Sequence, residues 1–208
     1  MQEGKAEKET VADGNENIQA AQDKISRAHG GWRELVRVFL VSLAIVVPIR
    51  YFVAQPFIVR GASMEPNFED SDYLIVDEFS YYVRPPDRNE VIVFRYPNDT
   101  RQFFIKRIIG LPGEQIQIKN GVITIKNKAH SDGFVIHESY LRPPNYPTHP
   151  DLFVTLGNDE YFVLGDNRDF SSDSRIWGTL KKNLIIGRPL IRAWPLKEAG
   201  FIPRYVEN

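Results

Sequence analysis

The chain has 208 residues and a formal net charge of −1, so it is long enough to bury a sizeable core but has no basic field that would hold nucleic acid. Its 42% hydrophobic and 25% charged residues exclude both a disordered chain and a polytopic membrane protein. The absence of cysteine excludes disulfides, thiolate zinc sites and a cysteine nucleophile. We expect neither a metal nor another cofactor.

The chain begins with a polar tail, which we assign to residues 1–33. As far as about Gly31 it is rich in Glu, Lys, Gln and Asn and has almost no large apolar side chain. Such a segment cannot offset the entropy cost of ordering, so we expect it to be solvated. A short amphipathic helix from about Ile18 to Ala28 is the alternative. Neither interpretation gives the tail a chemical role.

An apolar segment follows, and we assign residues 34–54 to a single transmembrane helix. From Val38 to Ala54 the apolar run is interrupted only by Ser42 and Arg50. A helix of this length is near the lower limit for crossing about 30 Å of hydrocarbon. Arg50 lies close enough to its end for the side chain to reach the lipid headgroups. A buried core helix is the alternative.

The charges beside this segment predict its orientation. Lysine and arginine gather on the amino side, and carboxylates follow the segment from Glu65 to Asp72. By the positive-inside rule, the tail stays in the cytoplasm and the chain after Ala54 faces outward.

The remainder is expected to be mainly β, an antiparallel sheet domain over residues 55–195. Short runs of Ile, Val, Phe and Tyr alternate there with turn residues, and Asn120-Gly121 predicts a type I′ hairpin. We interpret residues 129–159 as a long excursion from the sheet, and residues 196–208 as a short tail. The expected strands are Phe57 to Val59, Tyr73 to Val76, Val91 to Phe94, Phe103 to Ile109, Gln115 to Ile118, Val122 to Ile125, Tyr161 to Leu164 and Leu184 to Ile186.

Ser63 is the first candidate for chemistry. It follows a predicted strand, and the small neighbours Gly61 and Ala62 leave its hydroxyl and backbone N–H open. That setting suits a nucleophile with an oxyanion-stabilising amide, although serine in a glycine-containing loop commonly only caps a turn. Glu65 stands where a G-x-S-x-G elbow needs glycine. No histidine lies in a segment with a catalytic signature, so the spacing neither indicates nor excludes a histidine triad.

Lys106 is the second candidate. Along a strand it shares one face with Phe104 and Ile108, and burial between them would lower the pKa of its amine. A lysine general base requires such a lowered pKa. The alternative is an edge strand whose lysine extends into water.

The third candidate is the polar run from Gly165 to Gly178. It does not fit a calcium loop, because Arg168 occupies a position that needs an oxygen ligand. Its carboxylates alternate with arginines, which favours ion pairs that hold a loop; paired catalytic carboxylates and a solvated loop are the alternatives. The charged residues concerned are Asp166, Arg168, Asp169, Asp173 and Arg175.

Together these segments resemble the type I signal peptidase (leader peptidase) family. The Ser-Met-x-Pro block is Ser63 to Pro66, the Lys-Arg block is Ile105 to Gly113, and the Gly-Asp-Asn-Arg-Asp block is Gly165 to Gly178. A fourth block, Asp72 to Val76, matches Gly-Asp-x-Leu-x-Val, with Ser71 where glycine is usual. The resemblance extends from the apolar segment to about Trp194.

The resemblance implies a serine/lysine dyad in which Ser63 is the nucleophile and Lys106 the general base. It also implies that Ser171 orients the lysine amine and that the Ser63 N–H holds the oxyanion. Many Gram-negative members add a serine hydroxyl at the position that is Gly61 here. Phe170 replaces a common asparagine, and Glu78 stands where lysine is frequent. The residues implied as structural support are Arg107, Asp166, Asp173 and Arg175.

The implied substrate is an exported preprotein whose signal peptide carries small residues at the first and third positions before the cut. It would lie extended beside the sheet, by β-augmentation. The residues implied to line its pockets are Phe57, Val59, Ala62, Met64, Phe104 and Ile105. The implied location is the bacterial plasma membrane, single-pass, in contact with lipid, near the protein export channel, with the β domain on the outer face.

Three alternatives stay open. A self-cleaving repressor-type protease uses the same serine/lysine chemistry, but no DNA-binding region precedes the β domain. A membrane-anchored β domain that only binds is disfavoured because Ser63, Lys106 and Ser171 are all present. Histidine-using eukaryotic relatives are disfavoured because lysine occupies the base position.

Overall fold

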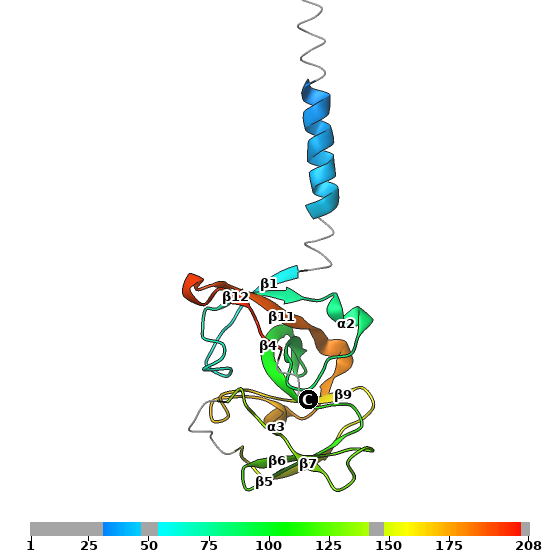
Figure 1. Ribbon diagram of the computed structural model, residues 1–208, viewed down its shortest axis with the longest axis vertical. Coiled ribbons are helices and arrows are strands. Elements are labelled where there is room, and N and C mark those ends of the chain that lie inside the picture. The colour runs from blue at the N-terminus through cyan, green and yellow to red at the C-terminus, as the bar shows by residue number, and fades with distance from the viewer. Residues whose placement is uncertain (1–30, 47–53, 142–147, 205–208) are drawn as a thin grey trace, which may run out of the picture. The chain divides into compact units, whose positions relative to one another are not determined.

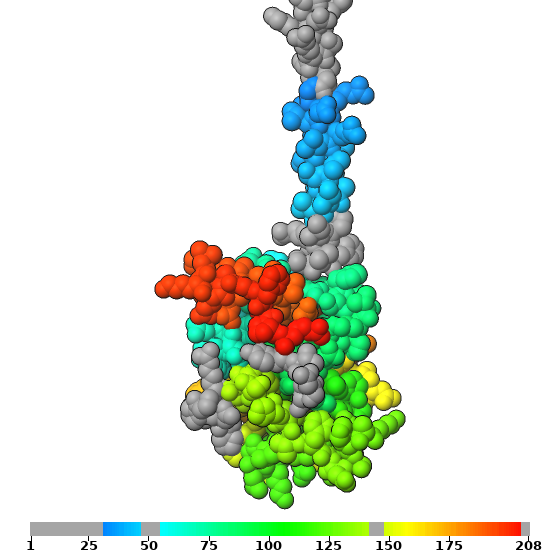
Figure 2. All heavy atoms as spheres, viewed as in Figure 1, coloured from blue at the N-terminus to red at the C-terminus, as the bar shows by residue number. Residues whose placement is uncertain are grey.

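The computed structural model describes residues 31–46, 54–141 and 148–204 (Figure 1). The chain divides into two compact units, Met1–Arg50 and Tyr51–Asn208. In the first, residues 31–46 form a helix whose apolar side chains, Leu35 and Phe39 among them, are exposed along its length (Figure 2). None of the described helices is both long and apolar enough to cross a bilayer. Residues 1–30 of the predicted tail and 47–53 of the predicted anchor lie outside the described residues.

The second unit confirms the mainly antiparallel β class, because every strand pair in it is antiparallel. The larger sheet has the order β1-β2-β11-β3-β4-β9-β10, and β12 pairs with β11. Its strands are β1 (Ala54–Ile58), β2 (Tyr73–Asp77), β3 (Val91–Tyr96), β4 (Asp99–Gly110), β9 (Glu160–Leu164), β10 (Leu180–Lys181), β11 (Ile185–Trp194) and β12 (Gly200–Phe201).

A second sheet has the order β7-β6-β5-β8 and lies at the end of the unit away from β1 and β2 (Figure 1). Its strands are β5 (Gln115–Lys119), β6 (Val122–Lys126), β7 (Phe134–Val135) and β8 (Leu152–Thr155). The segment 129–159, expected to leave the sheet, contributes β7 and β8 to this second sheet. Asn120 and Gly121 have φ of 51° and 81° between paired strands, as a type I′ hairpin requires.

Short helices complete the unit. Two are α-helical, α2 (Ser80–Val83) and α3 (Ser174–Trp177), and two are 3₁₀ turns, η1 (Lys182–Leu184) and η2 (Leu196–Glu198). The apolar residues of alternate strand positions turn inward, so that Ile116 and Ile118 of β5 meet Ile123 and Ile125 of β6 in one buried cluster. β4 links the two sheets, because its buried carboxyl-terminal half reaches the same cluster through Ile109.

Candidate active site

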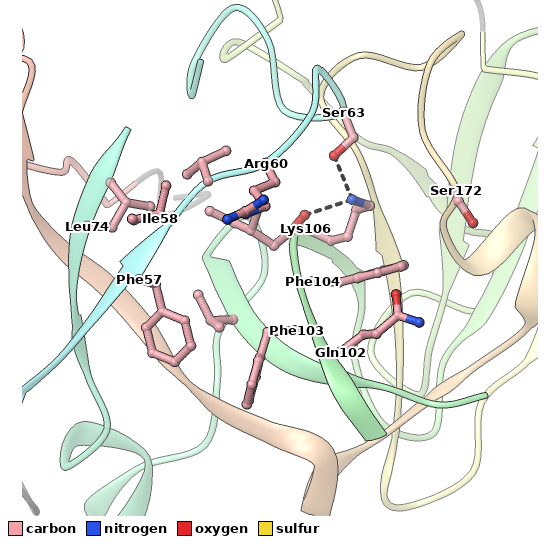
Figure 3. A pocket seen from close by; sticks show the side chains of 13 residues that line it. Phe57, Ile58, Arg60, Ser63, Leu74, Gln102, Phe103, Phe104, Lys106 and Ser172 are labelled. Carbon is pink, nitrogen blue, oxygen red and sulfur yellow. Dashed lines mark hydrogen bonds between the residues drawn. The ribbon is translucent and has the colours of Figure 1, made fainter. Parts of the chain in front are cut away.

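Ser63 and Lys106 lie in contact although 43 positions separate them. Ser63 lies in the loop between β1 and β2, and Lys106 lies on β4. The Lys106 Nζ donates a hydrogen bond to Ser63 Oγ at 2.7 Å and another to the Ile105 carbonyl at 2.9 Å (Figure 3). The short Nζ to Oγ distance also allows the reverse bond, in which a neutral amine accepts the serine proton.

The backbone around Ser63 is held from both sides. Gly61 has a φ of +82°, which favours glycine, and its N–H donates to Asp70 Oδ1 at 2.7 Å. The Asn167 N–H donates to the Ser63 carbonyl at 3.0 Å. No hydrogen bond occupies the Ser63 N–H within the part of the chain that the structure describes. Gly61 therefore has its N–H already engaged, whereas that of Ser63 is free to meet an oxyanion.

Burial sets the charge of Lys106. Its side chain packs beside Phe104, with Nζ 5.4 Å from the ring centroid, and the residue is only 4% exposed. Desolvation lowers the pKa of the amine from 10.5 to about 8, and the negative charges of Asp173 and Asp166 oppose part of that fall. About half of the amine is therefore neutral near pH 8. Sequence reasoning expected this burial from the strand neighbours of Lys106.

Ser171 lies near the Ser63 backbone but hydrogen-bonds neither Ser63 nor Lys106 among the described residues. Its Oγ is buried and has no hydrogen-bond partner among the described residues. A Cβ placed on Gly165 would lie 2.2 Å from Ser171 Oγ and 2.5 Å from the Ser63 carbonyl oxygen, so Ser171 packs against the backbone that carries Ser63. The bond from Ser171 to the lysine amine expected from the sequence is not formed among the described residues, where that amine donates to Ser63 and Ile105.

Ion pairs hold the loop from Gly165 to Gly178. Arg107 makes a bidentate contact with Asp166, from Nε to Oδ1 at 2.8 Å and from Nη2 to Oδ2 at 2.6 Å, and both side chains are almost fully buried. Arg175 meets Asp173 in the same way, at 2.8 Å for each bond, and Asp173 also accepts the N–H of Gly165. Of the described charges that alternate in this run, only Asp173 and Arg175 pair with each other; Asp166 pairs with Arg107 of β4 and Arg168 with Glu138.

A cavity of about 500 Å³ opens beside Ser63 and Lys106. Four of the six predicted pocket residues line it: Phe57, Val59, Phe104 and Ile105. The prediction for Met64 is wrong, because this side chain does not line the cavity and packs instead in the core against Phe68 and Leu74. Ala62 does not line the cavity either. The lining residues that sequence reasoning missed are Ile58, Arg60, Leu74, Val93, Gln102, Phe103 and Ser172.

Two unpaired strand edges border this cavity. Among the described residues, β1 pairs only with β2 and the first half of β4 pairs only with β3, because β9 reaches no further than Arg107. Phe57 on β1 and Phe103 on β4 meet edge to face, with their centroids 5.5 Å apart. An extended peptide can therefore pair with free backbone groups beside Ser63. No group of three or more histidine, aspartate or glutamate side chains suited to a metal ion occurs among the described residues.

Comparisons with known proteins identify the family. The family model described as signal peptidase, peptidase S26, matches residues 32–194. A probable signal peptidase I-2 from Synechocystis sp. is 35% identical over 196 residues, which cover 90% of this chain and 85% of that protein. A signal peptidase I from Bacillus caldolyticus is 34% identical over 175 residues, covering 78% and 92% of the two chains.

Among solved structures, a signal peptidase I from Enterococcus faecalis is 31% identical, with a TM-score of 0.43; the match covers 50% of this chain and 97% of that one. The family model covers well over half of the chain and spans both Ser63 and Lys106. The chain therefore belongs to the signal peptidase family, peptidase S26.

Proposed function

We propose that the chain is a membrane-anchored serine endopeptidase that removes signal peptides from exported preproteins, with Ser63 as nucleophile and Lys106 as general base. The contact of 2.7 Å between Lys106 Nζ and Ser63 Oγ carries this proposal. The family and the relatives named signal peptidase I support the activity.

The reaction begins when the neutral Lys106 amine takes the Ser63 proton as Oγ attacks the scissile carbonyl carbon. The carbonyl oxygen becomes an oxyanion, which the Ser63 N–H stabilises. The lysine ammonium then gives its proton to the leaving amine, so the mature chain departs and an acyl-enzyme remains. In the second half, Lys106 takes a proton from water as the water oxygen attacks the ester carbon, and the lysine ammonium then returns that proton to Ser63 Oγ as the ester bond breaks. This regenerates Ser63 and the neutral amine, and the signal peptide leaves as a carboxylic acid that loses its proton to solvent.

Ser171 is proposed to orient the lysine amine during these transfers. Lys106 Nζ has three N–H donors when protonated, and two are used on Ser63 and Ile105. The buried Ser171 Oγ has no other hydrogen-bond partner among the described residues, so it is free to accept the third.

The substrate is proposed to bind as an added strand between β1 and the first half of β4. Backbone pairing gives affinity, and the apolar cavity beside Ser63 selects small side chains at the first and third positions before the cut. Phe57, Val59, Phe104 and Ile105 form its walls.

Anchoring to the membrane is proposed for residues 34–54, with the catalytic domain at residues 55–195 on the outer face of a bacterial plasma membrane, near the export channel. The helix of residues 31–46 presents exposed apolar side chains, as lipid contact requires. In the catalytic unit, Ile58, Tyr73 and Trp194 lie opposite one another across β1, β2 and β11 and are all exposed. Ile58 follows the proposed anchor closely in the sequence, and an exposed row of this kind suits the membrane interface.

The test is cleavage of a preprotein with a small-x-small site by the purified full chain in detergent, with the new amino terminus sequenced. We expect one cut after the small residue in the wild type, and none in Lys106→Ala. Lys119→Ala, an exposed lysine of the second sheet, is the matched control and should cleave normally. Binding of the preprotein without any cut would favour the binding-protein alternative, and a cut in the chain itself would favour the self-cleaving one.

A further inference from the structure

Arg60 is a cation in the wall of the catalytic cavity that the mechanism does not use. It lies three residues before Ser63, is exposed, and lines the cavity together with Ser63 and Lys106. Its guanidinium points toward the cavity in the close view (Figure 3). The wall is otherwise made mostly of apolar side chains, so a charge there has few local groups to interact with.

The charges that line this cavity are all positive. Of its 13 lining residues, Arg60 and Lys106 are basic, none is acidic, and the remaining polar side chains are Ser63, Gln102 and Ser172. A cavity whose charged side chains all have one sign attracts ligand groups of the opposite charge and repels groups of the same charge. A substrate carboxylate is therefore favoured at this site, and a substrate lysine or arginine is disfavoured.

Asp70, the acid whose pKa Arg60 helps to lower, does not neutralise Arg60 by direct contact. One Asp70 oxygen accepts the Gly61 N–H at 2.7 Å and the other accepts the Ser71 hydroxyl at 3.0 Å. No hydrogen bond or ion pair joins Arg60 to any described residue, although its charge helps to lower the pKa of Asp70. The five N–H donors of the guanidinium stay available to a ligand, and their planar fork suits a carboxylate.

We propose that Arg60 is a specificity-determining residue that favours preproteins carrying Asp or Glu within two residues of the cleavage site over preproteins carrying Lys or Arg there. The inference rests on the proposed function and names a substrate preference of the same site. The small side chains at the first and third positions before the cut occupy the cavity itself. The charged side chain that meets the exposed Arg60 is therefore expected at a neighbouring position, either the second before the cut or the first two after it.

The test uses peptides with one fixed small-x-small site and Asp, Asn or Lys at each of these three positions in turn. For the wild type, kcat/KM should be about fivefold higher with Asp than with Asn at one position, and lower with Lys than with Asn. A fivefold effect is of the size that an exposed ion pair contributes. The effect should appear mainly in KM and should shrink in 0.5 M NaCl. Arg60→Lys should keep the preference, Arg60→Gln should remove it, and Arg60→Glu should reverse it.

Lys119→Glu makes the same change of charge on an exposed residue of β5 and should leave the preference unchanged. Equal rates for Asp, Asn and Lys at all three positions in the wild type would overturn the proposal, as would an unchanged preference in Arg60→Glu. A wild type that cuts none of the peptides, the neutral ones included, would instead contradict the proposed peptidase activity. The two failures are therefore distinguishable.

Discussion

Replacing Lys106 with Met should change how the stability of the protein depends on pH. In the folded state the pKa of Lys106 is lowered to about 8 by burial, whereas in the unfolded chain it is near 10.5. Below pH 8 the lysine is charged in both states, and the folded state alone has to bury that charge. The fall in pKa corresponds to a destabilisation of about 3 kcal/mol at neutral pH.

This destabilisation disappears as the pH rises from about 8 to 10.5, because the lysine then becomes neutral in the unfolded chain as well. Between pH 7 and pH 9.5, Lys106 should therefore raise the free energy of unfolding by about 2 kcal/mol. Lys106→Met lacks this rise. Its lost hydrogen bonds to Ser63 and Ile105 cost about 1 kcal/mol each, but that cost does not vary with pH.

The assay is urea unfolding of the full chain in detergent at both pH values, followed by tryptophan fluorescence. The stability of the wild type minus that of Lys106→Met should rise by about 2 kcal/mol between pH 7 and pH 9.5. Taking this difference removes the titration of the tyrosines, which both proteins share. If the free energy of unfolding of the wild type minus that of Lys106→Met stays constant or falls between the two pH values, then burial does not lower the pKa of Lys106, and this account is refuted.

Three further predictions concern the same site and the anchor. The kcat/KM of the wild type should rise with pH to a plateau, with a midpoint near 8, because only the neutral Lys106 amine can accept the proton; Lys106→Arg should be inactive throughout, and substantial activity in it would restore a histidine mechanism. Ser171→Ala should lower kcat at least tenfold, with a smaller change in KM, and a change confined to KM would argue against an orienting role. Protease added to intact spheroplasts should degrade the chain after Ala54 and spare the first 33 residues; the opposite pattern would reverse the orientation.

Much of the strand content could be predicted from the sequence, because alternating Ile, Val and aromatic residues form strands wherever one face can be buried. The Asn120-Gly121 hairpin was predictable for a local reason, since both residues must adopt positive φ. The strands β7, β10 and β12 have two residues each, and β8 has four. They are strands because a neighbour in the sheet pairs with them, and this cannot be deduced from so short a pattern.

The site, like the fold, could be predicted from the sequence only in part. The burial of Lys106 follows from its neighbours on β4, but its contact with Ser63 depends on how β1 and β4 come together, which spacing does not specify. Met64 was misplaced because an apolar residue beside a nucleophile suits either a pocket or the core, and only packing decides between them. Ser71 stands where the signal peptidase block usually has glycine. Its φ is 71°, a positive value that glycine adopts readily, and the chain adopts it here with serine in place.

The most direct test of the proposed dyad is the rate of preprotein cleavage by Ser63→Ala. The substitution removes one oxygen atom from a half-buried loop residue, so the fold and the membrane association should be unchanged, as circular dichroism and fractionation would show. We expect no detectable cut after the small residue under conditions in which the wild type processes the preprotein completely. Turnover at even about a tenth of the wild-type rate would contradict the assignment of Ser63 as nucleophile, because enzymes that lose a nucleophile lose orders of magnitude in kcat.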